Sequence, residues 1–472
     1  MSAEFLNALK RILTADEIID DSALEPMLID ERKQFRGRAL IAVQPRSTEN
    51  VAAIIRLCKE HCIAVVPQGG NTGYCGGATP DTSGTQLLLS LRRLNRCRWI
   101  DPDTRCVTVE AGMILENLQQ LADVNDLLFP LSMGSQGSCQ IGGNLATNAG
   151  GLAVLRYGTA RDLVLGLEVV TPNGEILDEL KSLRKDNTGY DLKHLFIGAE
   201  GTLGIITAAS LKLFPKPSVR VVAWLALPSI EILAPLLLNL QRSVGDCVSS
   251  FEYISAASLG YVLKNVPDTR SPTVDQDEHS VLVEFSGFGD AEPFQTLCQN
   301  ALICAQQENL IRDAVFANSL SQSQSFWQLR ETIPRAEKLM GGSIKHDVSV
   351  PISRMAQLIE QLKPAIVALA KDARLSIYGH VGDGNIHFNV LPPEATSIES
   401  FKQAKGEEIS AAIHDLAAEF AGSFSAEHGV GQLKAGELVR YASPERLALM
   451  RTLKQALDPA NIMNPGKVLR TS

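Results

Sequence analysis

The sequence lacks the features that mark membrane and secreted proteins. Although 45% of its 472 residues are hydrophobic, no uninterrupted apolar run approaches the roughly 20 residues that a membrane span requires. The first residues, MSAEFLNALKRILTADEIIDD, contain no signal-peptide core and carry acids that a mitochondrial presequence would avoid. The nine cysteines include no CxxC pair and are scattered like ordinary apolar residues. We therefore expect a cytoplasmic protein with free, non-catalytic thiols.

An excess of positive charge is also missing. The 44 Lys and Arg residues stand against 53 Asp and Glu residues, which gives a formal net charge of −9, and no basic stripe is present. Nucleic-acid binding depends on basic side chains that neutralise phosphates, so this class of function is excluded. Neither GxGxxG nor GxxxxGK[ST] occurs, which argues against a classical dinucleotide fold and a P-loop. The length predicts two or three domains.

The most informative motif that is present is GHVGDGNIHFN, residues 379–389. The runs 374–381 and 386–390 on either side of its GDGN turn predict the two strands of a hairpin. His380 and His387 would then lie on facing arms of this hairpin.

A carboxylate and a further histidine, Glu427 and His428, follow later in the chain. Two imidazoles and one carboxylate leave coordination positions open for a substrate, which is typical of a catalytic metal site. His428 would remain for proton transfer. The alternative is a set of polar residues that finish a surface hairpin, and the clustering favours the metal site. The remaining histidines to which we assign structural roles are His61, His194, His279 and His414.

Three glycine-rich stretches lie among strand-like runs, at residues 67–77, 134–151 and 198–205. Their Gly-Gly pairs alternate with Asn, Thr and Ser, so that backbone N–H groups can approach an anion without obstruction by side chains. Ordinary turns are the alternative for any one stretch. Three stretches of this composition predict a phosphate-containing cofactor.

The chain changes character after Lys216. Strands are predicted at 219–227, 249–254, 280–288 and 313–317, with helices at 229–244 and 291–309. This alternation predicts a separate antiparallel sheet with helices on one face. The boundary between the two parts is expected at Lys216-Pro217.

These motifs resemble those of a known family. PQGGNTG, GGNLATNAGG, GAEGTLGI and NPGK are similar to the flavin-binding loops of the vanillyl-alcohol oxidase superfamily. GHVGDGNIHFN and SAEHG resemble its FAD-linked D-2-hydroxyacid dehydrogenase branch. The resemblance runs from about residue 38 to the C-terminus. It implies an α+β, two-subdomain FAD-binding fold with an antiparallel-sheet substrate cap, and the isoalloxazine at the junction.

The resemblance also implies the domains and the cofactor positions. Residues 1–216 would bind FAD, residues 217–429 would form the cap with the metal site, and residues 430–472 would return to the FAD domain. Covalent relatives usually carry a histidine where this chain has Asn71, so the flavin is expected to be dissociable. The family's flavin-binding positions correspond to Gly69, Gly70, Asn71, Thr72, Gly73, Gly142, Gly143, Thr147, Asn148, Tyr157, Gly158, Glu200, Gly204 and Asn464.

By the same resemblance, His380, His387 and Glu427 would hold a divalent metal, with zinc as the expected ion. His428 would be the general base and flavin N5 the hydride acceptor. Asn389 would hydrogen-bond the substrate.

Arg330 and Lys345 match family positions that bind the substrate carboxylate, a task that suits the planar fork of arginine. Pro334 stands where some D-2-hydroxyglutarate enzymes have a hydroxyl residue, which puts recognition of a distal carboxylate in doubt. His346 is expected either to line the pocket or to be structural. Arg335 and Lys338 read as a solvated helix face.

The implied activity is oxidation of a D-2-hydroxy acid to the 2-oxo acid. D-2-Hydroxyglutarate is the first choice of substrate, and D-lactate and D-malate are its rivals. An oxygen-using FAD oxidase and a non-catalytic metal- or flavin-binding module are the other classes considered. Electron-transfer flavoprotein or a quinone is the expected acceptor, and a homodimer is one assembly left open.

Overall fold

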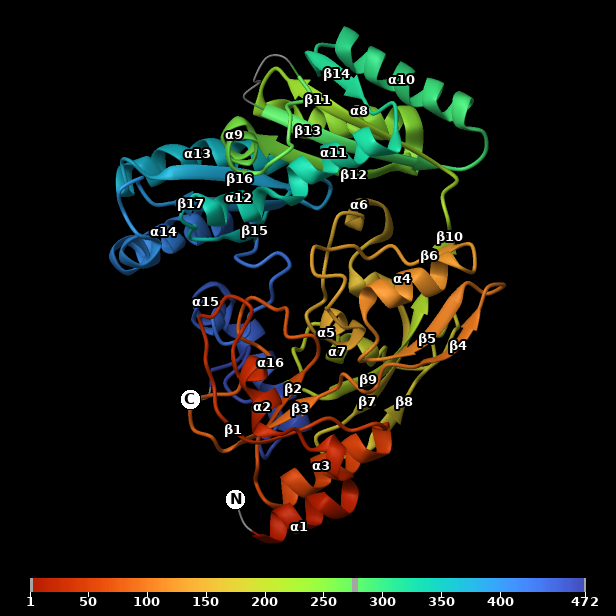
Figure 1. Ribbon diagram of the computed structural model, residues 1–472, viewed down its shortest axis with the longest axis vertical. Helices are drawn as coiled ribbons and strands as arrows, with labels where there is room; N and C mark the ends of the chain where they lie inside the picture. Colours follow the sequence, from red (N-terminus) through yellow and green to blue (C-terminus); the bar gives the residue numbers. More distant parts are fainter. Residues whose placement is uncertain (1–2, 274–278, 471–472) are drawn as a thin grey trace. The chain divides into compact units, whose positions relative to one another are not determined.

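The computed structural model describes residues 3–273 and 279–470, which form two compact units (Figure 1). The first unit contains the chain up to Gly151, Gly158–Lys216 and the chain from Glu427 onward. The second contains Leu152–Tyr157 and Pro217–Ala426. The short excursion Leu152–Tyr157 into the second unit is not indicated by the sequence patterns.

The first unit is built around two sheets. Its helices are α1 (Ala3–Ile12), α2 (Asp21–Leu24), α3 (Thr48–Glu60), α4 (Leu115–Asp123), α5 (Ile141–Ala146), α7 (Lys193–Phe196), α15 (Ala435–Tyr441) and α16 (Pro444–Leu457). The parallel sheet has the order β1 (Ala39–Val43), β3 (Gln86–Ser90), β2 (Val65–Gln68). The antiparallel sheet has the order β4 (Cys97–Asp101), β5 (Cys106–Glu110), β9 (Ile205–Lys212), β7 (Val164–Val170), β8 (Ile176–Asp178). A small pair joins β6 (Leu127–Leu128) to β10 (Phe214–Pro215).

Helix α3 begins directly after a capping residue, Ser47. The Ser47 side chain accepts a hydrogen bond from the Asn50 amide, which satisfies one of the unpaired N–H groups at the helix start. Val51, Ile54 and Ile55 on its inner face are fully buried against the parallel sheet and α1. Burial of each such side chain contributes about 2 kcal/mol. The helix thus fixes the sheet from which the first glycine loop leaves.

The second unit is a seven-stranded antiparallel sheet. Its order is β14 (Asp313–Phe316), β11 (Val219–Leu227), β13 (His279–Gly287), β12 (Val248–Ser255), β16 (Arg374–His380), β17 (Asn385–Leu391), β15 (Asp347–Ser349). Its helices are α6 (Val154–Tyr157), α8 (Leu233–Val244), α9 (Ala256–Asn265), α10 (Ala291–Gln307), α11 (Leu320–Glu331), α12 (Ile333–Leu339), α13 (Met355–Leu369) and α14 (Ile398–Glu419).

Helices cover both faces of this sheet, so the expectation of helices on one face is wrong. Leu225 packs in the cluster with residues of α8, α10, α13 and α14, whereas Trp224 packs with residues of α9, α11 and α12. Both side chains are fully buried. Neighbouring residues of a strand point to opposite faces, so the nearly continuous apolar run VRVVAWLAL needs cover on both sides.

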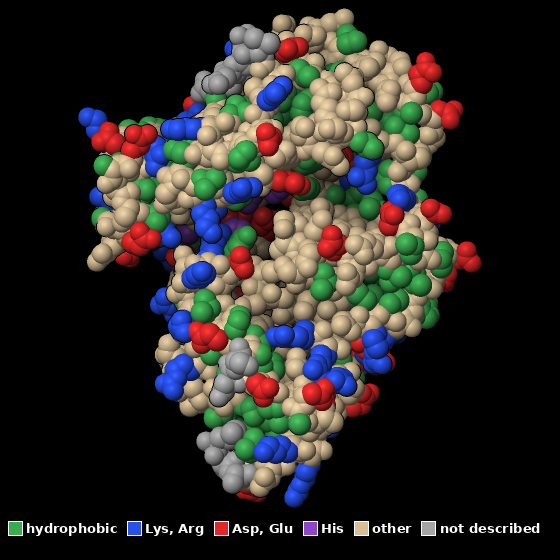
Figure 2. All heavy atoms as spheres, in the orientation of Figure 1, with side chains coloured by type: hydrophobic (Ala, Val, Ile, Leu, Met, Phe, Trp, Pro, Cys, Tyr) green, Lys and Arg blue, Asp and Glu red, His purple; other side chains and the backbone are tan. Residues whose placement is uncertain are grey.

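Surface charges of both signs are interspersed on the face of the molecule that Figure 2 shows. Within the described ranges, no helix has both the length and the apolar character needed to cross a membrane.

Candidate functional site

The histidine motif forms the predicted hairpin. Strand β16 ends at His380, β17 begins at Asn385, and the two strands pair antiparallel. Gly384 closes the turn with a φ of 78°, and a Cβ at this position would lie 2.0 Å from the Val350 carbonyl oxygen. Glycine is therefore required here both for the left-handed backbone and for the close approach.

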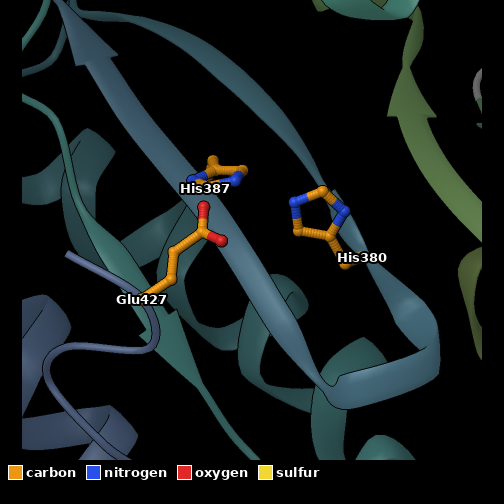
Figure 3. A group of neighbouring side chains, drawn as sticks. All are labelled: His380, His387 and Glu427. Carbon is orange, nitrogen blue, oxygen red and sulfur yellow. The ribbon is translucent and has the colours of Figure 1, made fainter. Parts of the chain in front are cut away.

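His380, His387 and Glu427 come together as the sequence predicts. Each offers a ligand atom, and these atoms all lie within 4.8 Å of one another. Figure 3 shows both rings and the carboxylate pointing toward a common space. Each histidine is only 9% exposed. Glu427 is the next residue after Ala426, whose amide donates to the Asp347 carbonyl of β15 (3.1 Å). The donor set suits a divalent cation such as zinc.

A second group of possible ligands shares Glu427. Asp347, Glu427 and His428 also offer atoms within 4.8 Å of one another. Asp347 is fully buried, and its Oδ1 accepts a hydrogen bond from the side-chain Nδ2 of Asn385 (2.7 Å) and lies 4.0 Å from Nδ1 of His387. Asp347 is therefore an acidic neighbour of the candidate cation ligands that sequence patterns did not reveal.

A buried carboxylate stands behind His380. Glu252 of β12 is 1% exposed, and its Oε1 lies 2.8 Å from Nδ1 of His380. Arg330 donates from Nε to Oε2 of the same carboxylate (2.9 Å), and its Nη2 lies 2.8 Å away without hydrogen-bond alignment. Burial alone would raise the pKa of Glu252, but His380 and Arg330 outweigh it and hold this pKa below its usual value.

The predicted substrate-binding residues each contact an acidic side chain of the protein. Lys345 lies 3.2 Å from Oε2 of Glu337, and Asn389 donates to Oε1 of the same, fully buried residue (2.8 Å). Arg330 is 5% exposed and stacks on Tyr378 at 4.7 Å in addition to its pairing with Glu252. These acids hold the three side chains in fixed orientations.

His346 lies within the second unit and is 3% exposed. Its Nδ1 is 3.0 Å from the Phe388 carbonyl oxygen and its Nε2 is 3.0 Å from Oγ of Ser410. Both ring nitrogens thus contact the protein, which favours the structural role over the pocket-lining one.

The glycine loops of the first unit surround a cavity. Gln140, Tyr74, Glu427 and His428 also line it. A Cβ at Gly73 or Gly143 would meet no atom within 4 Å, so the backbone there is accessible to a ligand. The predicted flavin-binding positions on its wall are Gly69, Gly70, Asn71, Thr72, Gly73, Gly142, Gly143, Thr147, Glu200 and Gly204.

Two features of this cavity fit a cofactor rich in hydrogen-bonding groups. The buried Oε1 of Gln140 has no hydrogen-bond partner among the described residues, so a ligand donor would satisfy it. Asn71 and Glu200 hold positive φ angles of 56° and 50°, a backbone conformation that costs about 1 kcal/mol or more in a non-glycine residue. Backbone strain of this kind concentrates at functional sites.

The other predicted flavin positions, Asn148, Tyr157, Gly158 and Asn464, are not among the residues that line the cavity. Asn148 accepts a hydrogen bond from the Arg161 amide (2.9 Å), and Tyr157 belongs to the second unit. Asn464 donates from Nδ2 to the carbonyl oxygens of Gly77 (3.0 Å) and Glu200 (2.8 Å). Asn464 therefore braces two of the glycine loops from behind.

Glu200 joins the third glycine loop to the segment that follows His428. Its carboxylate accepts hydrogen bonds from the amides of Val430 (2.7 Å) and Gly431 (2.9 Å), and burial raises its pKa. The His428 ring packs edge-on against Tyr74, with centroids 4.9 Å apart. These contacts fix Glu427 and His428 in the cavity wall.

Sequence reasoning missed Glu252, Glu337, Asp347, Gln140 and Tyr74. A signal was present for Glu252, because it is the acidic residue in the otherwise apolar strand core FEYI. Its partner His380 lies 128 residues further along, so the pairing itself required the fold.

Comparisons with known proteins agree with this architecture. A family model described as FAD linked oxidases, C-terminal domain, matches residues 216–468, and an FAD binding domain matches residues 39–179. The chain is 39% identical to "D-2-hydroxyglutarate dehydrogenase, mitochondrial" of Bos taurus, over 100% of this chain and 84% of the relative. It is 37% identical to the "D-2-hydroxyglutarate dehydrogenase" of Xanthomonas citri, over 94% and 92% of the two chains.

Solved structures show the same fold at low identity. p-Cresol methylhydroxylase superposes with a TM-score of 0.72 at 16% identity, over 98% of this chain and 96% of the other. 4-Ethylphenol oxidase from Gulosibacter chungangensis gives a TM-score of 0.74 at 17% identity, over 99% and 98%. The fold is thus the FAD-binding α+β fold of the vanillyl-alcohol oxidase type, as the sequence motifs predicted.

The fold and the matched domains define an FAD-dependent oxidoreductase. The chain belongs to the FAD-linked oxidase family, in its D-2-hydroxyacid dehydrogenase branch.

Proposed function

We propose that this protein oxidises D-2-hydroxyglutarate to the 2-oxo acid as an FAD- and metal-dependent dehydrogenase. The observation that carries the proposal is the position of Glu427 and His428. Both line the glycine-loop cavity, and Glu427 also belongs to the cluster with His380 and His387. One dipeptide thus connects the expected flavin site with the expected cation site.

His380, His387 and Glu427 would hold the cation, for which zinc is the expected ion. A bound divalent cation lowers the pKa of an alcohol as it does that of water. FAD bound in the glycine-loop cavity would supply the acceptor, flavin N5, for the C2 hydrogen and its electron pair.

His428 takes the hydroxyl proton, and the C2–O bond becomes the carbonyl of the 2-oxo acid. Arg330 and Lys345 would pair with substrate carboxylate, and Asn389 would hydrogen-bond the substrate. The contacts of Arg330 with Glu252, and of Lys345 and Asn389 with Glu337, support this role because they restrain the three side chains. The flavin would be held without a covalent bond, because Asn71 stands at the usual attachment position.

The names of the relatives support D-2-hydroxyglutarate as the first substrate, with D-lactate and D-malate as rivals. The electron acceptor would be electron-transfer flavoprotein or a quinone, which artificial dyes can replace.

Anaerobic mixing of the purified enzyme with D- and L-2-hydroxy acids tests this function. We expect D-2-hydroxyglutarate to bleach the flavin and, in turnover with a dye, to have the highest kcat/KM of D-2-hydroxyglutarate, D-lactate and D-malate. The L-isomers should leave the flavin oxidised. A clear preference for D-lactate would overturn the substrate, and bleaching by L-isomers would overturn the stereochemistry. Rapid peroxide formation in air would instead identify an oxidase.

A further inference from the structure

We propose that Glu252 is a positioning residue. It determines which ring nitrogen of His380 carries the proton, and it couples the cation site to Arg330, the residue expected to bind the substrate carboxylate. This inference rests on the proposed function. It starts from the register of the sheet, in which Glu252 of β12 lies directly opposite His380 of β16. Glu252 is also paired with Leu282 of β13, so its backbone is held by strands on either side in the middle of the seven-stranded sheet.

The carboxylate defines which nitrogen of His380 carries the proton. An ionised carboxylate only accepts hydrogen bonds, so the 2.8 Å contact with Nδ1 requires a proton on that nitrogen. In the neutral imidazole, Nε2 then carries the lone pair that a cation needs. A carboxylate behind a metal-binding histidine also fixes the ring plane and strengthens the nitrogen as a ligand.

The two histidines of the cluster differ in this respect. The carboxylate of Asp347 lies 4.0 Å from Nδ1 of His387, which is beyond hydrogen-bonding distance. Glu252 therefore orients His380 more tightly than Asp347 orients His387.

Glu252 also holds Arg330, through Oε2. The carboxylate is 1% exposed, and the side chain of Arg330 is 6% exposed. The carboxylate of Glu252 needs both the hydrogen bond from His380 and the charge of Arg330, because a buried carboxylate with only one of these partners would be poorly compensated. The same side chain consequently positions a cation ligand and the residue expected to bind substrate carboxylate.

The test is the metal affinity of Glu252→Gln. The amide can present either its oxygen or its NH2 group to Nδ1, so it no longer imposes one protonation pattern on His380. We expect zinc affinity, measured by competition with a chromophoric chelator, to fall about 10- to 100-fold. The visible absorption of the cobalt-substituted enzyme should also change, because it reports the geometry of the ligands.

Glu284→Gln is the matched control. Glu284 lies on β13, is partly buried, and accepts hydrogen bonds from Ser249 (3.2 Å) and Trp327 (3.2 Å), neither of which belongs to the cluster. The zinc affinity of the Glu284→Gln variant should stay within twofold of that of the wild type. Because Glu252→Gln leaves Arg330 buried without its charged partner, the double variant Glu252→Gln/Arg330→Gln provides a charge-balanced form if the single variant does not fold.

Zinc affinity within twofold of the wild type in the single variant, or in the double variant where only that folds, would overturn the role of Glu252. A wild-type enzyme that binds no divalent cation would instead overturn the metal site of the proposed function. A wild type that binds zinc but does not oxidise D-2-hydroxy acids would overturn the activity alone. The three results are therefore distinguishable.

Discussion

His428 is the residue on which the proposed chemistry depends most directly. Its position follows from neighbours on both sides, because Glu427 belongs to the cation cluster and the amides of Val430 and Gly431 are held by Glu200. The edge-on contact with Tyr74 restricts the ring further. A base that must abstract a proton at one atom benefits from this restriction.

Replacement of His428 by Asn should lower kcat about 100- to 10,000-fold, the usual contribution of a general base. Flavin and metal content should remain as in the wild type, as measured by absorbance and elemental analysis. His194→Asn is a suitable control, because the His194 side chain is 44% exposed and lies in another part of the chain. Unaltered turnover in His428→Asn with both cofactors bound would remove the proposed base.

Lys467, in the terminal NPGK motif, is a buried basic residue that should make the free energy of unfolding depend on pH. Burial lowers its pKa to about 8, although Asp81 and Glu200 act in the opposite direction. The unfolded chain keeps this proton up to a pH of about 10.4. Between these values the unfolded state binds more protons, so the free energy of unfolding should rise with pH, by about 3 kcal/mol at most.

The comparison of wild type with Lys467→Met isolates this effect. The difference between their unfolding free energies should shift in favour of the wild type from pH 8 to pH 10 in urea titrations. The exposed Lys10, replaced by Met, should show no such shift. A difference that does not change with pH would mean that Lys467 titrates normally.

The roles of single residues could be predicted where a short sequence motif contains them. They could not be predicted where a role depends on a contact partner that is distant in the sequence. His380, His387 and Glu427 stand in recognisable motifs, and the structure brings them together. Glu252 and Glu337 act through partners that only the sheet and helix packing place beside them. Long-range charge pairing is set by strand register, which one sequence does not reveal.

At the scale of elements, the hairpin of β16 and β17 carries most of the site. Gly384→Ala would place a non-glycine residue at φ 78° and a Cβ 2.0 Å from the Val350 carbonyl oxygen. We expect a loss of about 2 to 4 kcal/mol in unfolding free energy and weaker zinc binding, because the arms that hold His380 and His387 must shift.

Gly406→Ala, in the same unit, should have the opposite effect on stability from Gly384→Ala. Gly406 lies within helix α14, and its added Cβ would make only an ordinary contact with Lys402, at 3.8 Å. Alanine in a helix interior should stabilise the protein by about 0.5 to 1 kcal/mol and leave zinc binding unchanged. Equal effects of the two substitutions on zinc binding would contradict the role assigned to the turn.

The hairpin at the GDGN turn matched its prediction, whereas the predicted helix cover of the second sheet did not. The Ser47 cap and the GDGN turn specify their structures through nearby hydrogen bonds and backbone angles. The prediction that helices cover one face of the second unit's sheet is wrong, because residues of α9, α11 and α12 pack on Trp224 at the other face. The apolar run of β11 already contained that information.

At the scale of the whole molecule, the chain leaves the first unit after Lys216 and returns at Glu427. The return delivers Glu427 and His428 to the glycine-loop cavity, and Asn464 then braces two of its loops. Sequence motifs predicted that the C-terminal segment returns. Its bracing contacts depend on backbone carbonyls, which leave no pattern in the sequence.

Removal of the metal should show that the proposed cation site and the proposed flavin site bind their cofactors independently. The cavity is lined by residues of the first unit, whereas two of the three proposed cation ligands come from β16 and β17. Treatment with a strong chelator should therefore lower turnover of D-2-hydroxyglutarate at least about 100-fold, as expected when polarisation of the hydroxyl is lost. The flavin spectrum should remain that of the bound cofactor, and added zinc should restore turnover. If elemental analysis shows the metal gone while turnover persists, the cluster at residues 380, 387 and 427 has no part in the reaction, and the base His428 would have to act on an unpolarised alcohol.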